Sequence, residues 1–477
     1  MYLELDGRGP LYDQLTRALK LAIQDGRIAV GTQLPPTREL AEELELSRTT
    51  VLAAYEQLRA EGYIDGRVGS GSYVSDLHPK PITHHADTAI PAPSRYAQRA
   101  REVRNWDIPR LHRGLRYDMQ YGHPILNPAL NNAWGRELTR AAAYTRLNIS
   151  EVAGLSSLRQ QTCDYLARRR GIQIQPDDVV IVSGTQQAIN LTARVLLNEG
   201  DRVVLEDPHY FSAHQALVAH GAHLVPVPVD DDGIVCSKLP EDSPRLIVVT
   251  PSHQFPTGSV LSMQRRQELL QYADRHQCWI MEDDYDGEFR YDAHPLAALR
   301  ALDEQDRVIY VGTFSKVMFG GLRLGYMVLP ATLRLDFINA KYLHDIACPV
   351  IEQAALAHFM EDGGFERHLR LARKELKTRR ETLIAALKEY ARDRVQVCDT
   401  PSGMHLSVWL RGYDAARCRA LVDYARDRGL GLHPMAPLYL NTPEKQGLML
   451  GYCGLSVPDL REATQLFGQC LDHFELH

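Results

Sequence analysis

The sequence lacks any apolar run that could cross a membrane. Within its 477 residues there is no stretch of 18 or more consecutive apolar residues, whereas a membrane-spanning helix needs about 20. The first residues, Met1-Tyr2-Leu3-Glu4-Leu5-Asp6, do not pair a basic leader with an apolar core. We therefore expect no membrane partner and no secretory signal.

Paired cysteines are also missing. The eight cysteines lie far apart, without a Cys-x-x-Cys pair and without the spacing of zinc ligands, at positions 163, 236, 278, 348, 398, 418, 453 and 470. Scattered cysteines of this kind are typical of reduced, buried thiols in a cytoplasmic protein. The sequence thus predicts a cytoplasmic location and no metal site.

Acidic residues outnumber basic residues over the whole chain. The formal net charge is −6, and the first 80 residues carry nine Lys and Arg against twelve Asp and Glu, a net of −3. A DNA-binding domain usually shows a basic footprint, so any such footprint here must arise from local placement. Residues 81–116 are the exception, because seven arginines there face three acidic residues, a net of +4.

Three regions differ in composition. Residues 1–76 alternate helical patterns and end in a Gly-rich stretch, and residues 77–113 hold five prolines and are predicted to be a linker. That linker either touches the DNA backbone or a partner, or is a solvated spacer. From Gly114 onward short apolar runs alternate with helical patterns, at 179–183, 202–206, 246–250, 279–282 and 308–311. We therefore predict an α/β domain over 114–477 with a mostly parallel sheet.

The first region predicts a winged helix-turn-helix DNA-binding domain. A helical stripe covers Leu11–Gly26, Thr37 can cap a second helix, and Ser47 can cap a third, which would lie in the major groove. Tyr63–Val74 is typical of a β-hairpin wing. Side chains at the third helix suit base edges and phosphates, and we expect operator DNA to contact Arg38, Ser47, Arg48, Thr49, Thr50, Gly69 and Ser70.

Helix-turn-helix spacing alone also occurs in ordinary helix pairs. Here, however, the whole segment from about residue 9 to 76 resembles the winged helix-turn-helix of GntR-family regulators. The matching stretches include Gly31-Thr32-Gln33-Leu34-Pro35, Thr37-Arg38-Glu39-Leu40-Ala41, Ser47-Arg48-Thr49-Thr50-Val51 and Glu61-Gly62-Tyr63-Ile64.

In the third region, groups with related chemistry follow the predicted strands. Lys316 follows one strand in Thr313-Phe314-Ser315-Lys316, and Arg323 comes seven residues later. Gly184, Thr185 and Gln186 open a helix, whose N-terminus suits a phosphate. Asp283 and Tyr285 close another strand, and Tyr210 follows a third. Pyridoxal phosphate needs such a set: a lysine for a Schiff base, a carboxylate for the ring nitrogen, phosphate donors and a stacking ring.

The order of these segments resembles that of fold-type I aminotransferases and, more narrowly, the aminotransferase-like domain of MocR-type regulators, a GntR subfamily. Further matching stretches are Gly154-Leu155-Ser156-Ser157-Leu158-Arg159 and Thr250-Pro251-Ser252-His253-Gln254-Phe255-Pro256-Thr257-Gly258. The resemblance implies that Lys316 carries the cofactor, Asp283 faces its ring nitrogen, and Tyr210 stacks on it. It also implies a head-to-tail homodimer in which each winged helix lies over the partner's large domain.

Two positions depart from the aminotransferase pattern. Phe255 stands where an asparagine usually bonds the cofactor's 3-hydroxyl, a bond that His253, Gln254 or Tyr285 could replace. Met449 stands where an arginine usually binds the α-carboxylate of the substrate, and a thioether cannot do so. We therefore predict a pyridoxal-phosphate-dependent transcriptional regulator that senses either the cofactor itself or an amine or amino-acid-like effector. The alternative is an active aminotransferase with an accessory DNA-binding domain.

Overall fold

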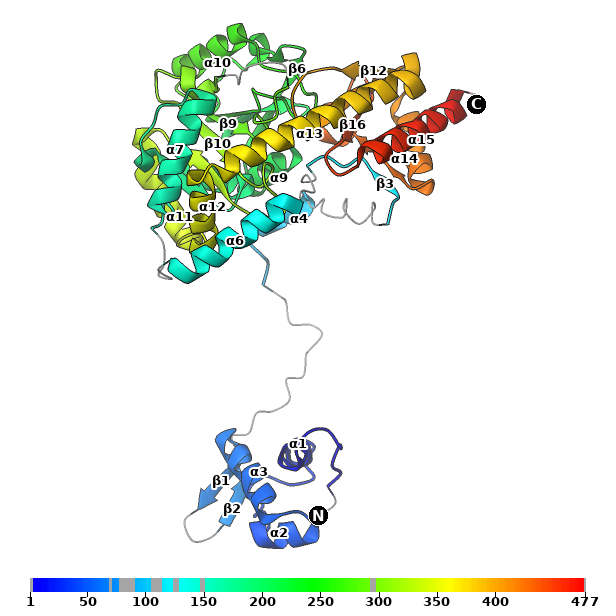
Figure 1. The fold of residues 1–477 in the computed structure, drawn as a ribbon. Coiled ribbons are helices and arrows are strands. Elements are labelled where there is room, and N and C mark those ends of the chain that lie inside the picture. The colour runs from blue at the N-terminus through cyan, green and yellow to red at the C-terminus, as the bar shows by residue number, and fades with distance from the viewer. Residues whose placement is uncertain are drawn as a thin grey trace. The chain divides into compact units, whose positions relative to one another are not determined.

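The computed structural model describes residues 3–67, 71–76, 91–103, 114–122, 128–145, 151–291 and 297–475. The chain divides into two compact units, Met1–Ala92 and Pro93–His477 (Figure 1). Each unit is built around its own apolar core, and we describe them separately. None of the described helices is long and apolar enough to span a membrane.

The N-terminal unit contains a helix-turn-helix followed by a hairpin. Its elements are α1 (Leu11–Gln24), α2 (Thr37–Glu43), α3 (Arg48–Ala60), β1 (Ile64–Arg67) and β2 (Gly71–Val74). The strands pair antiparallel, with Ile64 opposite Val74, as expected for a wing. The helices pack through the predicted apolar stripes, and Leu15, Leu40 and Val51 are fully buried.

Of the two predicted helix caps in this unit, one is confirmed and one is wrong. The Ser47 side chain accepts a hydrogen bond from the backbone N–H of Thr50 at 3.1 Å, so Ser47 caps α3 as predicted. Thr37 does not cap α2. It is the first helical residue, and the preceding position is Pro36, which has no side-chain acceptor. A proline is tolerated at the start of a helix because its fixed φ suits the turn into the helix.

The large unit is built on a mixed, mainly parallel sheet. The strands within the described ranges are β4 (Val179–Val182), β5 (Arg202–Asp207), β6 (His223–Asp230), β7 (Gly233–Ile234), β8 (Leu246–Val249), β9 (Trp279–Asp284), β10 (Val308–Thr313) and β11 (Gly325–Val328), in the order β4-β11-β10-β9-β8-β5-β6-β7. All five predicted strands are present. Only β11 and β7 run antiparallel to their neighbours. The chain between β10 and β11 is too short for the crossover that a parallel pairing requires.

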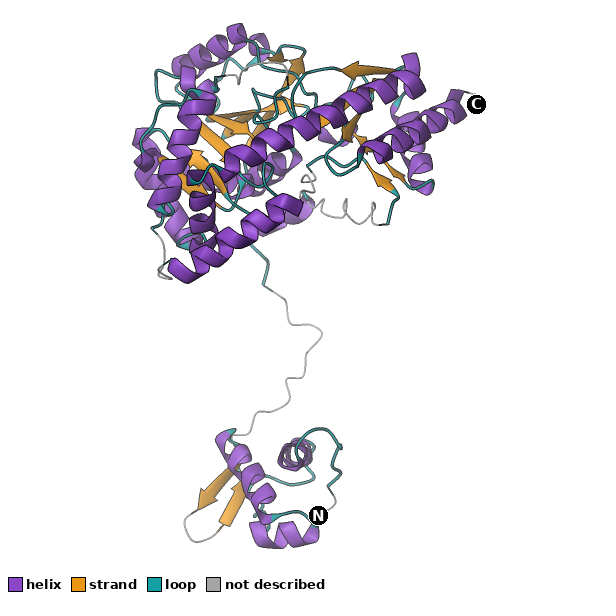
Figure 2. Ribbon diagram, in the orientation of Figure 1, coloured by secondary structure: helices purple, strands orange, loops and turns teal. Residues whose placement is uncertain are grey.

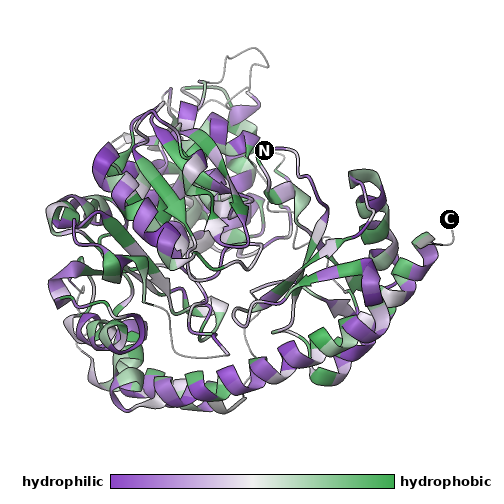
Figure 3. Ribbon diagram, turned by 90° about the horizontal axis from the view of Figure 1, so that it is seen from above, coloured by the Kyte–Doolittle hydropathy of each residue, from purple (hydrophilic) through white to green (hydrophobic). Residues whose placement is uncertain are grey.

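Helices cover both faces of this sheet (Figure 2). One face packs against α8 (Thr185–Leu196), α9 (Phe211–His220) and α11 (Arg334–Asp345). The other packs against α7 (Ser156–Arg170), α10 (Met263–His276) and α12 (Val350–Glu361). Because both faces are covered, strands such as Val179–Val182 are apolar throughout. Figure 3 shows this in its largely green, hydrophobic strands.

A smaller lobe follows the long helix α13 (Gly364–Ala386). It contains a second sheet in the order β12-β13-β16-β15, with helices on one side. Its elements are β12 (Val395–Cys398), β13 (His405–Leu410), α14 (Ala415–Asp427), β15 (His433–Pro434), β16 (Gly447–Gly451) and α15 (Val457–Glu475). The short strand β3 (Tyr117–Asp118) pairs with β14 (Leu430–Gly431), and α6 (Pro128–Tyr144) packs on α12.

A short helix lies within the segment that the prolines predict to be a linker. This helix, α4 (Arg95–Glu102), packs against α9, and the guanidinium of Arg99 bonds both Glu199 and the carbonyl of Ala219. Part of the arginine excess in residues 81–116 therefore binds the large unit itself. Residues 77–90 and 104–113 of the predicted linker lie outside the described residues.

Candidate functional site

A cavity of about 140 Å³ lies at the carboxyl ends of the central strands in the large unit. Its lining is Tyr121, Thr185, Gln186, Tyr210, Thr250, Phe255, Asp283, Tyr285, Thr313, Ser315, Lys316 and Arg323. Every cofactor-binding residue predicted from the sequence is in this lining except Gly184, which lies next to Arg323. Parallel strands bring these residues together because their carboxyl ends meet at one edge of the sheet.

Asp283 places a carboxylate without a described partner in this cavity. It is the last residue but one of β9 (Trp279–Asp284), is 5% exposed, and its Oδ1 has no hydrogen-bond partner among the described residues. Burial, together with the nearby carboxylates of Asp284 and Asp286, raises the pKa of Asp283 to about 8. A buried acid in this state gains most from a ligand that brings a positive charge or a donor to that oxygen.

Lys316 lies in the loop after β10, with its Nζ 5.6 Å from the centre of the Tyr121 ring. Burial lowers the pKa of this lysine, although Asp286 and Asp283 partly oppose the shift. A lowered pKa increases the fraction of free amine, which is the nucleophilic form. Lys316 is therefore suited to bond covalently with a carbonyl compound in the cavity.

Donors for an anion surround one part of the cavity. Thr185 and Gln186 begin α8, and the hydroxyls of Thr313 and Ser315 lie in the same lining. Arg323 Nη2 donates to the carbonyl of Ser183 at 2.9 Å, which fixes the guanidinium beside Gly184. Gly184 has a φ of +93°, and a Cβ there would lie 3.1 Å from Arg323 Nη2. These hydroxyls, helix-end N–H groups and guanidinium suit a phosphate dianion.

Aromatic rings form the opposite part. Phe255 lies at their centre, with ring centroids 4.9 Å from Tyr121, 5.5 Å from Tyr210 and 5.9 Å from Tyr285. Met449 in β16 belongs to the same cluster and is 3% exposed, packed with Phe255, Met435 and Leu438. Lys316 and Arg323 are the cations in the described lining, and Lys316 Nζ lies 5.6 Å from the centre of the Tyr121 ring; no arginine or lysine besides these two belongs to that lining.

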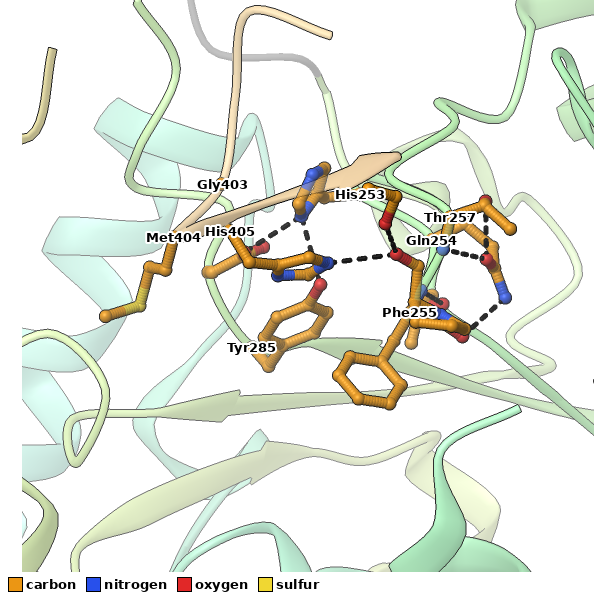
Figure 4. A network of polar contacts seen from close by, with 12 residues as sticks. His253, Gln254, Phe255, Thr257, Tyr285, Gly403, Met404 and His405 are labelled. Carbon is orange, nitrogen blue, oxygen red and sulfur yellow. Dashed lines mark hydrogen bonds and ion pairs between the residues drawn. The ribbon is translucent and has the colours of Figure 1, made fainter. Parts of the chain in front are cut away.

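The structure distinguishes the three side chains proposed to compensate for Phe255. Tyr285 lines the cavity. The Gln254 amide instead donates to the carbonyls of Pro208 and Phe255, so it joins its own loop to the one after β5. His253 lies behind Tyr285, with its Nδ1 3.0 Å from the tyrosine hydroxyl (Figure 4).

Sequence reasoning missed two lining residues and one buried pair. Tyr121 follows β3 in a segment without periodicity, and no local pattern indicates that it reaches Lys316. Thr250 ends a predicted strand, 246–250, but the sequence pattern assigns it no role in the site; its hydroxyl donates to Glu206 at 2.6 Å. The partner of His253, Asp286, follows Tyr285 directly, and only the folded loop brings the two side chains together.

In the N-terminal unit, the predicted DNA contacts cluster at the start of α3. Ser47, Arg48 and Thr49 are exposed. The hydroxyls of Thr49 and Thr50 lie 2.8 and 2.7 Å from Ser47 Oγ. Arg38 is 82% exposed at the start of α2, and its Nε lies 3.8 Å from Glu42. Gly69 and Ser70 lie outside the described residues.

Comparisons with known proteins follow this division into two units. The family of bacterial regulatory proteins named gntR matches residues 11–74, and the aminotransferase class I and II family matches residues 121–446. The probable rhizopine catabolism regulatory protein MocR of Rhizobium meliloti is 35% identical over 97% of this chain and 94% of its own length. The chain belongs to the MocR-type GntR regulators.

Other relatives of this MocR-type chain support the same architecture. The pyridoxine biosynthesis transcriptional regulator PdxR of Corynebacterium glutamicum is 28% identical, over 92% of this chain and 91% of its own length. Among solved structures, Pyrococcus horikoshii kynurenine aminotransferase in complex with PMP has a TM-score of 0.73 at 27% identity, covering 80% of this chain and 97% of that one. The large unit of this MocR-type regulator therefore has the aminotransferase fold, and the predicted fold class is confirmed.

Proposed function

We propose that this regulator binds pyridoxal phosphate covalently through Lys316 and binds operator DNA through α3. The observation that carries the proposal is the pairing, in one cavity, of the lysine whose pKa is lowered with the buried, unpartnered carboxylate of Asp283. The solved aminotransferase LysN of Thermus thermophilus, 25% identical with a TM-score of 0.72, was crystallised with a phosphopyridoxyl amino acid. That relationship supports the same cofactor here.

The described residues fit this cofactor group by group. Asp283 Oδ1 would accept from the ring nitrogen, and Tyr285 would face the 3-hydroxyl. Tyr210 would stack on the ring. The phosphate would be held by Gly184, Thr185, Gln186, Thr313, Ser315 and Arg323. When bound, the cofactor supplies an electron sink that can stabilise a carbanion on an attached amine.

The aromatic part of the cavity limits which effector this regulator senses. Because Met449 and Phe255 form an apolar cluster there, an α-carboxylate would be desolvated without a partner among the described residues. The effector is therefore either pyridoxal phosphate itself or an amine without a carboxylate, and we favour the cofactor. The same cluster argues against an aminotransferase acting on α-amino acids.

We further propose a head-to-tail homodimer in which the cofactor changes operator affinity. Arg48 and Arg38 would bind phosphates or bases, with Thr49 and Thr50 completing the contact from the first turn of α3. Cofactor binding would then favour one placement of the DNA-binding domain over another. Such a link is a coupling free energy between two sites, usually of about 1–3 kcal/mol.

Gel shifts test the proposal on an operator selected from a random duplex library. Adding pyridoxal phosphate to the cofactor-free protein should change the apparent dissociation constant for DNA by about tenfold, which corresponds to about 1.4 kcal/mol. The variant Lys316→Ala should bind DNA with an affinity that does not change when pyridoxal phosphate is added. Arg48→Ala should lose DNA binding, while its absorption spectrum still changes on addition of pyridoxal phosphate. An operator complex that ignores the cofactor in the wild type would show that the cofactor is not the signal.

A further inference from the structure

A buried pair of side chains supports Tyr285 from behind, outside the cavity lining. The Nδ1 of His253 lies 2.9 Å from Asp286 Oδ2 and 3.0 Å from the hydroxyl of Tyr285. The side chains of His253 and Asp286 are only 2% and 1% exposed. The cofactor site described above makes no direct use of either residue, so the purpose of a buried acid and a buried imidazole here has to be explained.

The contacts of His253 determine where the hydrogen of Tyr285 can go. With Asp286 Oδ2 as the acceptor of their hydrogen bond, the hydrogen lies on His253 Nδ1. A protonated Nδ1 has no lone pair to accept another hydrogen. The Tyr285 hydroxyl beside it can therefore only accept from His253, and its own hydrogen must point elsewhere. Tyr285 also lines the cavity, so a ligand there can offer an acceptor for this hydrogen.

Close packing holds the His253 ring in this orientation. Gly403 has a φ of +86°, and a Cβ there would collide with the His253 ring, while one at Gly258 would lie 3.1 Å from Nε2. The His405 ring lies beside it, with centroids 5.1 Å apart (Figure 4). His405 Nε2 bonds the carbonyl of Pro256 at 3.0 Å, and burial followed by His253 lowers the pKa of His405 to about 4. His253 therefore packs against a neutral neighbour.

We propose that His253 and Asp286 are positioning residues that aim the hydroxyl hydrogen of Tyr285 into the cavity, toward the ring oxygen of the cofactor. This inference rests on the proposed binding of pyridoxal phosphate to Lys316. A donor fixed in this way stabilises the anionic form of the ring oxygen. It therefore lowers the pKa of the proton that this oxygen shares with the lysine nitrogen. The pair thus compensates for the amide that Phe255 lacks.

Several other titratable groups face the pair. These are Asp283, Tyr285, Tyr291, Lys316, His405 and Cys453. Burial raises the pKa of the Cys453 thiol far above neutrality and that of Tyr285 above its usual value, so both stay protonated. His405 stays neutral above about pH 4, for the reason given above. Asp283, whose pKa is about 8 in the cofactor-free fold, would bond the ring nitrogen once the cofactor is bound, and the lysine-bound cofactor is then the group whose protonation the absorption band follows near neutral pH.

The experiment is a pH titration of the visible absorption band after loading the full-length protein with pyridoxal phosphate. His253→Leu removes the donor and leaves Asp286 as a competing acceptor for the tyrosine hydrogen. The pH midpoint of the absorption change in this variant should rise by about one pH unit, the size expected for losing one hydrogen bond to a charged group. His253→Asn keeps an N–H near the Nδ1 position and should restore a midpoint near the wild-type value.

Two further variants keep the inference falsifiable if His253→Leu folds poorly. Tyr285→Phe should shift the midpoint at least as far as His253→Leu, and combining the two should add nothing, because they act through one bond. Asp286→Asn removes both the acceptor that orients His253 and a negative charge that raises the pKa of Lys316, and these two losses act in opposite directions, so its shift should be smaller than that of His253→Leu. An unshifted midpoint in Tyr285→Phe, or in His253→Leu beside a shifted Tyr285→Phe, would overturn the inference alone. A wild-type protein without any band would overturn the proposed function as well.

Discussion

The two parts of the cavity differ in what they offer a ligand. Around Lys316, the described side chains supply a carboxylate, hydroxyls, helix-end N–H groups and the guanidinium of Arg323. Around Phe255, rings and thioethers replace the polar groups. The polar part offers the groups that a phosphorylated pyridine needs, whereas the aromatic part offers rings and thioethers. On the proposed function, the polar part holds the cofactor and the aromatic part limits what can bind beside it.

The largest effect is expected where the aromatic part is made polar. Phe255→Asn would leave a cavity and bury an amide among rings, which should lower the free energy of unfolding by about 4 kcal/mol. The matched change Phe255→Leu keeps the site apolar and should cost only about 1.5 kcal/mol. Urea unfolding followed by circular dichroism measures both. Equal losses would mean that this part of the cavity tolerates polar groups.

In the polar part, Asp283 should contribute most to cofactor affinity. Asp283→Asn removes the charged acceptor for the ring nitrogen, and losing such a bond should weaken pyridoxal phosphate binding about 100-fold. Tyr210→Phe keeps the stacking ring and serves as the control, with affinity close to the wild type. Absorption titrations give both constants. An Asp283→Asn affinity within a few fold of the wild type would contradict the role assigned to this carboxylate.

The pH dependence of stability should reveal the same carboxylate without cofactor. The pKa of Asp283, about 8 in the fold, lies above its ordinary value of 3.8. The folded protein therefore holds a proton that the unfolded chain releases, and this residue costs increasing stability as the pH rises from about 4 to about 8. Unfolding of the cofactor-free protein should show Asp283→Asn gaining on the wild type with rising pH. A constant difference would refute this.

The smallest predicted effect is a change in ligand preference, from amines toward amino acids, when Met449 is replaced by arginine. Met449→Arg would place a guanidinium beside the aromatic rings, where it can bind a carboxylate through two hydrogen bonds. The loaded variant should bind phenylalanine about tenfold more tightly relative to phenethylamine than the wild type does, a change of about 1.4 kcal/mol. Met449→Leu should keep the wild-type ratio. A ratio unchanged by the arginine would mean that Met449 does not face the effector.

Much of the polar part could be predicted because its residues follow strands. Asp283 and Lys316 each lie just after an apolar run, and parallel strands place such positions at one edge. The aromatic part was harder, because Tyr121 and Met449 come from distant segments that meet only in the folded large unit. The pairing of His253 with Asp286 depends on a buried loop.

Predictions from the local sequence were wrong or incomplete where a tertiary contact or an adjacent residue determined the structure. Thr37 has the side chain of a helix cap, but Pro36 occupies the capping position. Proline content in residues 77–113 is typical of a linker, yet Arg99 within it bonds Glu199 as part of α4. Ser47, by contrast, occupies the capping position of α3 itself and accepts from the backbone N–H of Thr50.

The account depends on a covalent bond between Lys316 and the cofactor, and one measurement tests it directly. The protein is incubated with pyridoxal phosphate, reduced with borohydride, digested and mapped by mass spectrometry. The account predicts one stable phosphopyridoxyl addition, on the peptide that contains Lys316, and none there in Lys316→Ala. Addition on other lysines, with the Lys316 peptide unmodified, would contradict it.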